Sequence, residues 1–242
     1  MNFMPFDNYN MCKFCYLNRY NQNMHNNFRN YNNYYRECNM ETIPLNEQIL
    51  RPKNFRITYP FVKDIGNENI SKFVNESIAN EVSNLFKEQA LPPEKINIQE
   101  VIGFYDVKLN KSCLLSILFG IYTYYANAAH GSTTYSSLNI DIDIDTGKIY
   151  KLSDLFTSRI NYKPILEQKV KEYIKVNNVP LLEEYKGLHE DQQFYLTPNS
   201  LVLYYPIYEY TPYAYGLFQV PIPFKDILNL LGPASPIQRL LK

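Results

Sequence analysis

Two stretches with the apolar spacing of a helix enclose three long extended runs, and this order limits the choice of folds more than any other feature of the sequence. Apolar residues recur three and four positions apart over residues 70–86 and again over residues 166–174, which predicts two amphipathic helices. The extended runs between them cover residues 96–109, 112–126 and 132–145. Because strands and helices do not alternate as in βαβ units, we predict an α+β fold with antiparallel sheets covered by the two helices.

Further strands are predicted on either side of this central region. Alternating apolar and polar residues indicate a strand at 55–61, and later strands are expected at 194–197, 201–205 and 216–222, followed by a closing helix at 224–231. The turn at 145–148 contains Gly147, which supplies a positive φ. We therefore divide the chain into a tail and linker (1–50), an N-terminal domain (51–127) and a C-terminal domain (128–242).

The first forty residues have a composition unlike the rest. They hold twelve Asn, six Tyr and all five Met, with few aliphatic residues, so we expect a disordered tail. Four soft ligands occur in it, at Cys12, Cys15, His25 and Cys38. They either form a structural zinc site or are incidental or redox-active thiols, because their spacing fits no known zinc motif. The tail is also suited to cross-linking through Tyr and Cys.

Charge and composition exclude several classes of function. The 24 Lys and Arg balance the 24 Asp and Glu, so the chain lacks the positive charge that drives nucleic-acid binding. Only three His and four Cys are present, which favours binding over catalysis, and we predict no cofactor and no enzymatic activity. The most apolar run, residues 113–122, is about half the length of roughly 20 residues needed for a membrane-spanning helix. No signal peptide is visible, so the predicted location is cytoplasmic or spore-associated.

Two motifs invite a chemical interpretation. Asp141, Asp143 and Asp145 alternate with isoleucines, which predicts an acidic face of a strand exposed to solvent; the sequence lacks the Gly and Glu of a calcium loop. His130 lies near Ser132, but the sequence contains no nucleophile elbow, so a turn histidine is the preferred interpretation over a hydrolytic pair.

Six tyrosines lie within the twelve residues 204–215, a stretch that also contains two prolines: Tyr204, Tyr205, Tyr208, Tyr210, Tyr213 and Tyr215. Tyrosine gives a large amphipathic contact area at low entropic cost, and Pro206 and Pro212 restrict the loop. A recognition surface and a tyrosine-lined strand pair packed on its own sheet are equally good interpretations. Alternate side chains of a strand face opposite sides, so one face cannot bury all six.

Several short motifs together resemble a known family. They are Tyr124 to Gly131 (Tyr-Tyr-Ala-Asn-Ala-Ala-His-Gly), Leu138 to Asp141, Asp145 to Lys148, Leu152 to Phe156, Phe194 to Thr197, Tyr208-Glu209 and Pro212 to Gly216. In order and spacing they resemble the paired domains of unknown function in the extracellular part of RsiV-type anti-sigma factors. The resemblance covers about residues 54–231, and the same pair precedes the catalytic domain of some peptidoglycan deacetylases.

The resemblance implies a noncatalytic α+β binding module, because the domain of the anti-sigma factors is a receptor for lysozyme. The implied partner is a lysozyme-like protein or a peptidoglycan fragment, held by loops that we expect to adjoin at one end of the sheet. The predicted ligand-binding residues are Tyr124, Tyr125, His130, Ser132, Pro206, Tyr208, Tyr210, Pro212, Tyr213 and Tyr215. The alternatives are a structural or spore-surface protein that acts through its tail and a cell-wall hydrolase.

Overall fold

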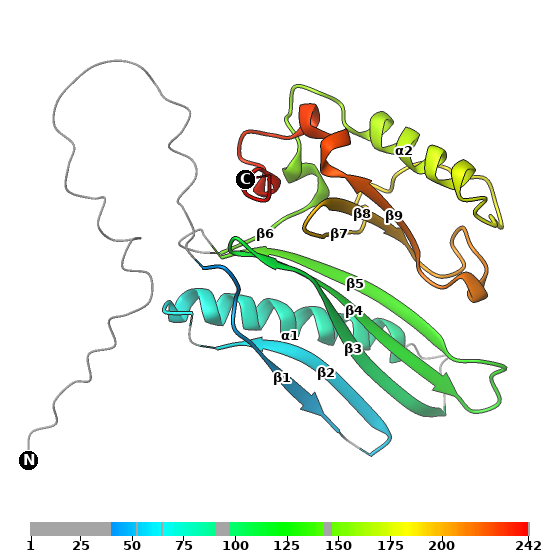
Figure 1. Cartoon of the computed structure of the whole chain (residues 1–242). Helices are drawn as coiled ribbons and strands as arrows, with labels where there is room; N and C mark the ends of the chain where they lie inside the picture. Colours follow the sequence, from blue (N-terminus) through cyan, green and yellow to red (C-terminus); the bar gives the residue numbers. More distant parts are fainter. Residues whose placement is uncertain (1–39, 52, 64, 91–96, 143–146, 242) are drawn as a thin grey trace, which may run out of the picture.

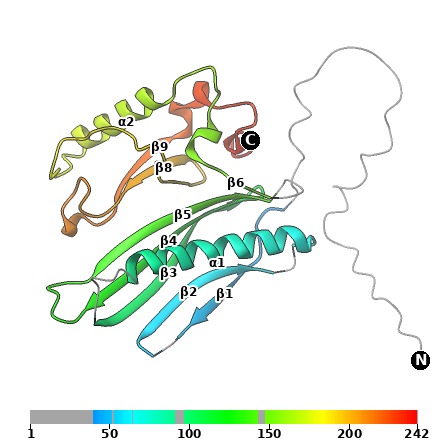
Figure 2. The same cartoon turned by 180° about the vertical axis from the view of Figure 1, so that it is seen from behind.

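The computed structural model describes residues 40–51, 53–63, 65–90, 97–142 and 147–241. A six-stranded sheet forms its centre, with helix α1 (Glu68–Ala90) on one face and a three-stranded sheet on the other (Figures 1 and 2). Two neighbouring residues of one strand, Ser136 and Ser137, show which layer covers each face of this sheet. Ser136 bonds to Glu81 of α1, whereas Ser137 donates to the carbonyl of Phe194 in the three-stranded sheet. The predicted α+β class is confirmed.

The six-stranded sheet follows the order of the sequence. Its strands are β1 (Leu45–Leu50), β2 (Phe55–Val62), β3 (Ile98–Lys111), β4 (Leu114–Tyr125), β5 (Ser132–Asp141) and β6 (Lys148–Ile149). All neighbours are antiparallel except β2 and β3, which pair in parallel. The prediction of purely antiparallel sheets was wrong at this pair, because α1 carries the chain across the sheet between the two strands.

Helix α1 forms where the apolar spacing predicts it. The Oδ1 atom of Asn67 accepts hydrogen bonds from the backbone of Asn69 (3.0 Å) and Ile70 (3.2 Å), which caps the first turn. Its buried face packs on the sheet through apolar residues that include Val74 and Ile78, both fully buried. The opposite side of the helix remains polar and exposed.

The second layer contains β7 (Phe194–Leu196), β8 (Ser200–Tyr205), β9 (Phe218–Pro223) and helix α2 (Lys163–Val176). Short 3-10 turns complete it, at Leu152–Leu155, Tyr213–Tyr215, Phe224–Asp226, Leu228–Leu230 and Pro236–Arg239. Strand β8 is covered on both sides. The hydroxyl of Tyr204 donates to Ser137 of the large sheet, whereas the ring of Tyr205 stacks on Phe218 in the core beneath α2.

The structure differs from the sequence prediction in two places and leaves two further predictions untested. Strand β1 begins within the segment that we expected to be a linker, and it pairs with β2 from Leu45 to Leu50. The closing helix expected at 224–231 is two separate 3-10 turns. The large sheet continues across residues 127 and 128, since β4 pairs with β5, whereas the division into domains stays a prediction. The predicted disordered tail lies outside the described residues.

Candidate functional site

Two loops that are far apart in the sequence meet at one end of the molecule. His130 lies in the connection between β4 and β5, and Tyr208 and Tyr213 lie in the connection between β8 and β9. The ring of His130 stacks on Tyr213 with 4.3 Å between centroids, and Tyr213 in turn stacks on Tyr208 at 5.9 Å. We call these three residues the ring cluster. The sequence prediction that the two loops adjoin is thereby confirmed.

Hydrogen bonds fix the orientation of His130. Its Nδ1 atom lies 2.8 Å from the carbonyl oxygen of Gly131, and its Nε2 atom lies 3.2 Å from the hydroxyl of Tyr208. A carbonyl only accepts, so Nδ1 carries a proton and donates to Gly131, and Nε2 forms the second hydrogen bond, with the phenol of Tyr208. Both nitrogens are thus engaged, and neither bonds to Ser132. The arrangement favours the turn histidine over a Ser-His pair.

We call the connection between β8 and β9, residues 206–217, the tyrosine loop; some of its side chains are exposed and others are buried. Tyr208 is 54% exposed, Pro206 and Tyr215 are exposed, and Pro212 and Tyr213 are partly exposed. Tyr208 also has a φ of 73°, which is rare for a residue with a side chain.

Tyr210 does not reach the surface as the prediction required. It is 2% exposed and packs edge-to-face on Tyr205, 5.2 Å away, while its hydroxyl accepts a hydrogen bond from the backbone of Lys186. Burial raises the pKa of the Tyr210 phenol above its ordinary value. This residue stabilises the loop from below and offers no surface to a ligand.

Tyr124, Tyr125 and Ser132 support the hairpin between β4 and β5. Tyr124 donates to the carbonyl of Ala128 within the loop, and Tyr125 donates to the carbonyl of Gln89 in the last turn of α1. The side chain of Gln89 donates to the carbonyl of Ser132 and accepts from Thr134. These contacts join the helix end to the loop that carries His130, so their role is to position the ring cluster.

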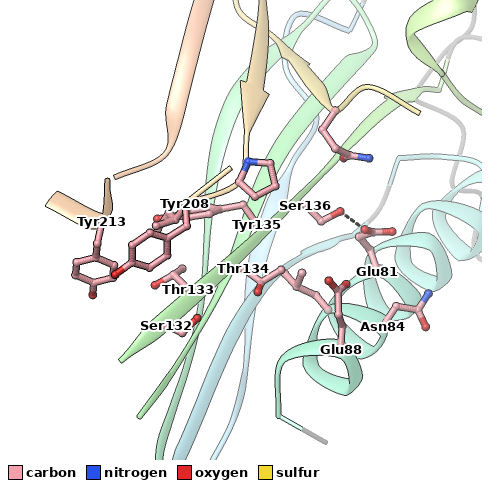
Figure 3. A pocket seen from close by; sticks show the side chains of 14 residues that line it. Glu81, Asn84, Glu88, Ser132, Thr133, Thr134, Tyr135, Ser136, Tyr208 and Tyr213 are labelled. Atoms are coloured by element: carbon pink, nitrogen blue, oxygen red, sulfur yellow. Dashed lines mark hydrogen bonds between the residues drawn. The ribbon is translucent and has the colours of Figure 1, made fainter. Parts of the chain in front are cut away.

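A cavity of about 500 Å³ lies beside the ring cluster (Figure 3). Helix α1 contributes Glu81, Asn84, Leu85 and Glu88, strand β5 contributes the five consecutive residues 132–136, and the remaining residues are Gln193, Pro206, Ile207, Tyr208 and Tyr213. The contribution of α1 to this cavity was not predicted from the sequence. The signal was present, because residues 81 and 88 are two turns apart and share one face of a helix.

The cavity has an acidic and aromatic lining. Glu81 and Glu88 bring two carboxylates from α1, and none of the lining residues is Lys or Arg. Burial raises the pKa of the Tyr135 phenol, and the nearby Tyr213 raises it further, so the Tyr135 phenol remains neutral near pH 7. The site therefore offers hydrogen-bond acceptors, hydroxyl groups and ring faces in a region of negative charge.

The acidic strand face that the sequence predicted is not exposed at Asp141. This residue is 4% exposed, and its Oδ2 atom lies 2.5 Å from the guanidinium of Arg239 and 2.9 Å from the hydroxyl of Tyr150. The solvent-facing interpretation is wrong there, because Arg239 neutralises the carboxylate inside the protein. Asp143 and Asp145 lie outside the described residues.

Within the described ranges, no three His, Cys, Asp or Glu side chains form a cluster that could hold a metal ion. The four candidate zinc ligands, Cys12, Cys15, His25 and Cys38, lie outside those ranges. No helix in the described part of the chain is long and apolar enough to span a membrane.

Part of the chain matches a known protein family model. Residues 153–225 match the family model "Protein of unknown function (DUF3298)", and the matched stretch includes α2, β7–β9 and the tyrosine loop. No curated protein matches the chain.

Two solved structures share the fold. A DUF3298 family member from Bacteroides fragilis is 18% identical, with a TM-score of 0.59 over 83% of this chain and 99% of that one. A DUF3298 family protein from Pseudomonas aeruginosa PAO1 is 15% identical, with a TM-score of 0.56 over 80% of this chain and 96% of that one. At these identities the likeness concerns the fold alone.

Proposed function

We propose that this chain is a noncatalytic binding module that holds a protein or cell-envelope ligand at the ring cluster. The observation that carries this proposal is the meeting of His130, Tyr208 and Tyr213 from two loops in different layers of the fold. Exposed aromatic rings held by mutual stacking lose little entropy on binding, which is the property of a preorganised recognition surface. The adjoining cavity adds acceptors and hydroxyl groups that can orient a ligand.

A protein ligand is the first choice. The motifs that resemble those of the RsiV-type receptors include Tyr124 to Gly131, Tyr208-Glu209 and Pro212 to Gly216, and these contain the three residues of the ring cluster. We therefore extend the resemblance to the binding of a lysozyme-like protein, with peptidoglycan fragments as the second ligand class. A hydrolytic role receives no support at His130, whose ring nitrogens bond to a carbonyl and a phenol.

The experiment is calorimetric titration of the full chain with lysozyme and, separately, with soluble peptidoglycan fragments. We expect at least one of them to bind, and Tyr213→Ala to weaken that binding at least about tenfold, as for a central aromatic residue of an interface. The comparison variant is Tyr215→Ala, which removes the same side chain from the same loop but lies outside the cavity lining, so its loss of binding should be smaller. Absence of heat with both ligands, or equal losses in the two variants, would refute the proposal.

A further inference from the structure

Strand β5 has one side that is mostly unpaired. On one side it pairs with β4 along its whole length, from Ser132 to Asp141. On the other side β6 pairs only with Ile140 and Asp141, and the backbone of Tyr150 donates to Asn139. Within the described part of the chain, residues 132–138 therefore have no strand beside them on that side.

The direction of the unpaired groups follows from the alternation of an antiparallel strand. The carbonyl of Asn139 points toward β6, because it accepts from Tyr150 at 2.8 Å. Every second residue points the same way, so the backbone N–H and C=O groups of Thr133, Tyr135 and Ser137 also point outward. No hydrogen bond from another described residue reaches these backbone groups. Unpaired edge groups of this kind are a template for another strand.

Most of this edge lies along the cavity. Residues 132–136 line the cavity in succession, with α1 on one side of the edge and the tyrosine loop on the other (Figure 3). An extended segment placed there would alternate its side chains between Glu81 and Glu88 on the helix side and Tyr135 and Tyr208 on the loop side. Seven residues of strand span about 23 Å, enough for a specific contact.

We propose that the free edge of β5 accepts an extended segment of a partner protein as an added strand, with basic side chains directed toward α1. Charge complementarity selects the occupant, because Glu81 and Glu88 are the charged residues of the lining and both are acidic. Main-chain hydrogen bonds supply affinity in this mode of recognition, and the side pockets supply specificity. The inference rests on the proposed function and names its partner as a basic, extended polypeptide.

The test uses a ten-residue peptide of alternating lysine and valine, added to the full chain and followed by NMR hydrogen exchange. We expect saturating peptide to slow exchange of the amides of Thr133, Tyr135 and Ser137 at least about tenfold, because these N–H groups become paired. A peptide with N-methyl groups on the amides of one edge keeps its charge and should bind at least about tenfold more weakly. Replacing its lysines by glutamates should abolish binding.

Variants of the protein give a second measurement. Thr133→Pro removes one outward N–H at an edge position that tolerates proline, and it should weaken peptide binding, whereas Thr133→Val keeps the N–H and should not. Glu81→Gln combined with Glu88→Gln should reduce affinity for the lysine peptide and its dependence on salt. Thermal unfolding of each variant checks that the fold is intact.

Several outcomes overturn the inference. Equal binding of the N-methylated peptide, or binding that leaves the three amides unprotected, shows that no strand is added. Protection that appears without peptide as the protein concentration rises shows that the occupant is a second copy of this chain. A partner that binds through Tyr213 but protects none of these amides rejects the added strand and preserves the proposed function, whereas a chain that binds neither peptide nor the earlier ligands loses both.

Discussion

Replacement of Arg239 by methionine should destabilise the fold by about 3 kcal/mol. The side chains of Arg239 and Asp141 are 9% and 5% exposed, and the Nη2 atom of Arg239 lies 2.5 Å from the Oδ2 atom of Asp141. Removing one member of a buried pair costs about 3–5 kcal/mol, because the remaining charge keeps its desolvation penalty. We expect the lower end of that range, since the hydroxyl of Tyr150 still donates to the carboxylate at 2.9 Å. The loss is large against a total stability of roughly 5–15 kcal/mol.

Urea unfolding of the full chain, followed by circular dichroism, measures this loss. The matched control is Arg159→Met, an exposed arginine whose replacement should change stability by less than about 0.5 kcal/mol. Adding Asp141→Asn should restore part of the stability, because the amide oxygen still accepts from Tyr150. A loss below about 1 kcal/mol, or strictly additive single effects, would refute the reasoning.

Three further predictions concern the tyrosine-rich layer. Tyr205→Phe should cost about 1–2 kcal/mol of unfolding free energy, because it removes the partner of the buried Tyr185 hydroxyl at 2.9 Å; an unchanged urea midpoint would contradict this. Gly216→Ala should cost about 1–3 kcal/mol although an added Cβ meets no atom within 4 Å, because φ 76° and ψ −151° suit only glycine; calorimetric unfolding measures the loss, and neutrality would show that the turn relaxes. Burial and the nearby Asp106 raise the pKa of Tyr195 to about 12. Above about pH 10 the unfolded chain releases the phenol proton of Tyr195 and the folded chain keeps it, so the free energy of unfolding should fall as pH rises toward 12. A free energy of unfolding that stays constant over this pH range would exclude the effect.

The sequence predicted the parts of the fold that depend on local pattern. The apolar spacing of α1 and the strands β3 to β5 follow from neighbouring residues. The parallel pairing of β2 with β3 does not, because the direction of a strand is decided by the path of the helix between them. Nor did local pattern predict the ion pair of Asp141, whose partner lies 98 residues further along the chain.

For the candidate site too, the sequence predicted some features and not those that depend on tertiary packing. The sequence predicted that His130 and the tyrosine loop adjoin, but it could not separate the exposed Tyr208 from the buried Tyr210. Alternation places Tyr204 and Tyr205 on opposite faces of β8, and both are buried because each face of that strand is covered by a different layer. Which tyrosines are available to a ligand thus depends on tertiary packing.

The long separation between Asp141 and Arg239 also affects how the protein is made. At a synthesis rate of roughly 5–20 residues per second, the 98 residues between them take about 5–20 s to translate. During that interval β5 and Asp141 have been synthesised, but Arg239 is not yet part of the chain. The end of the large sheet at Asp141 thus gains its buried cation only after the last 3-10 turn, Pro236–Arg239, has been synthesised.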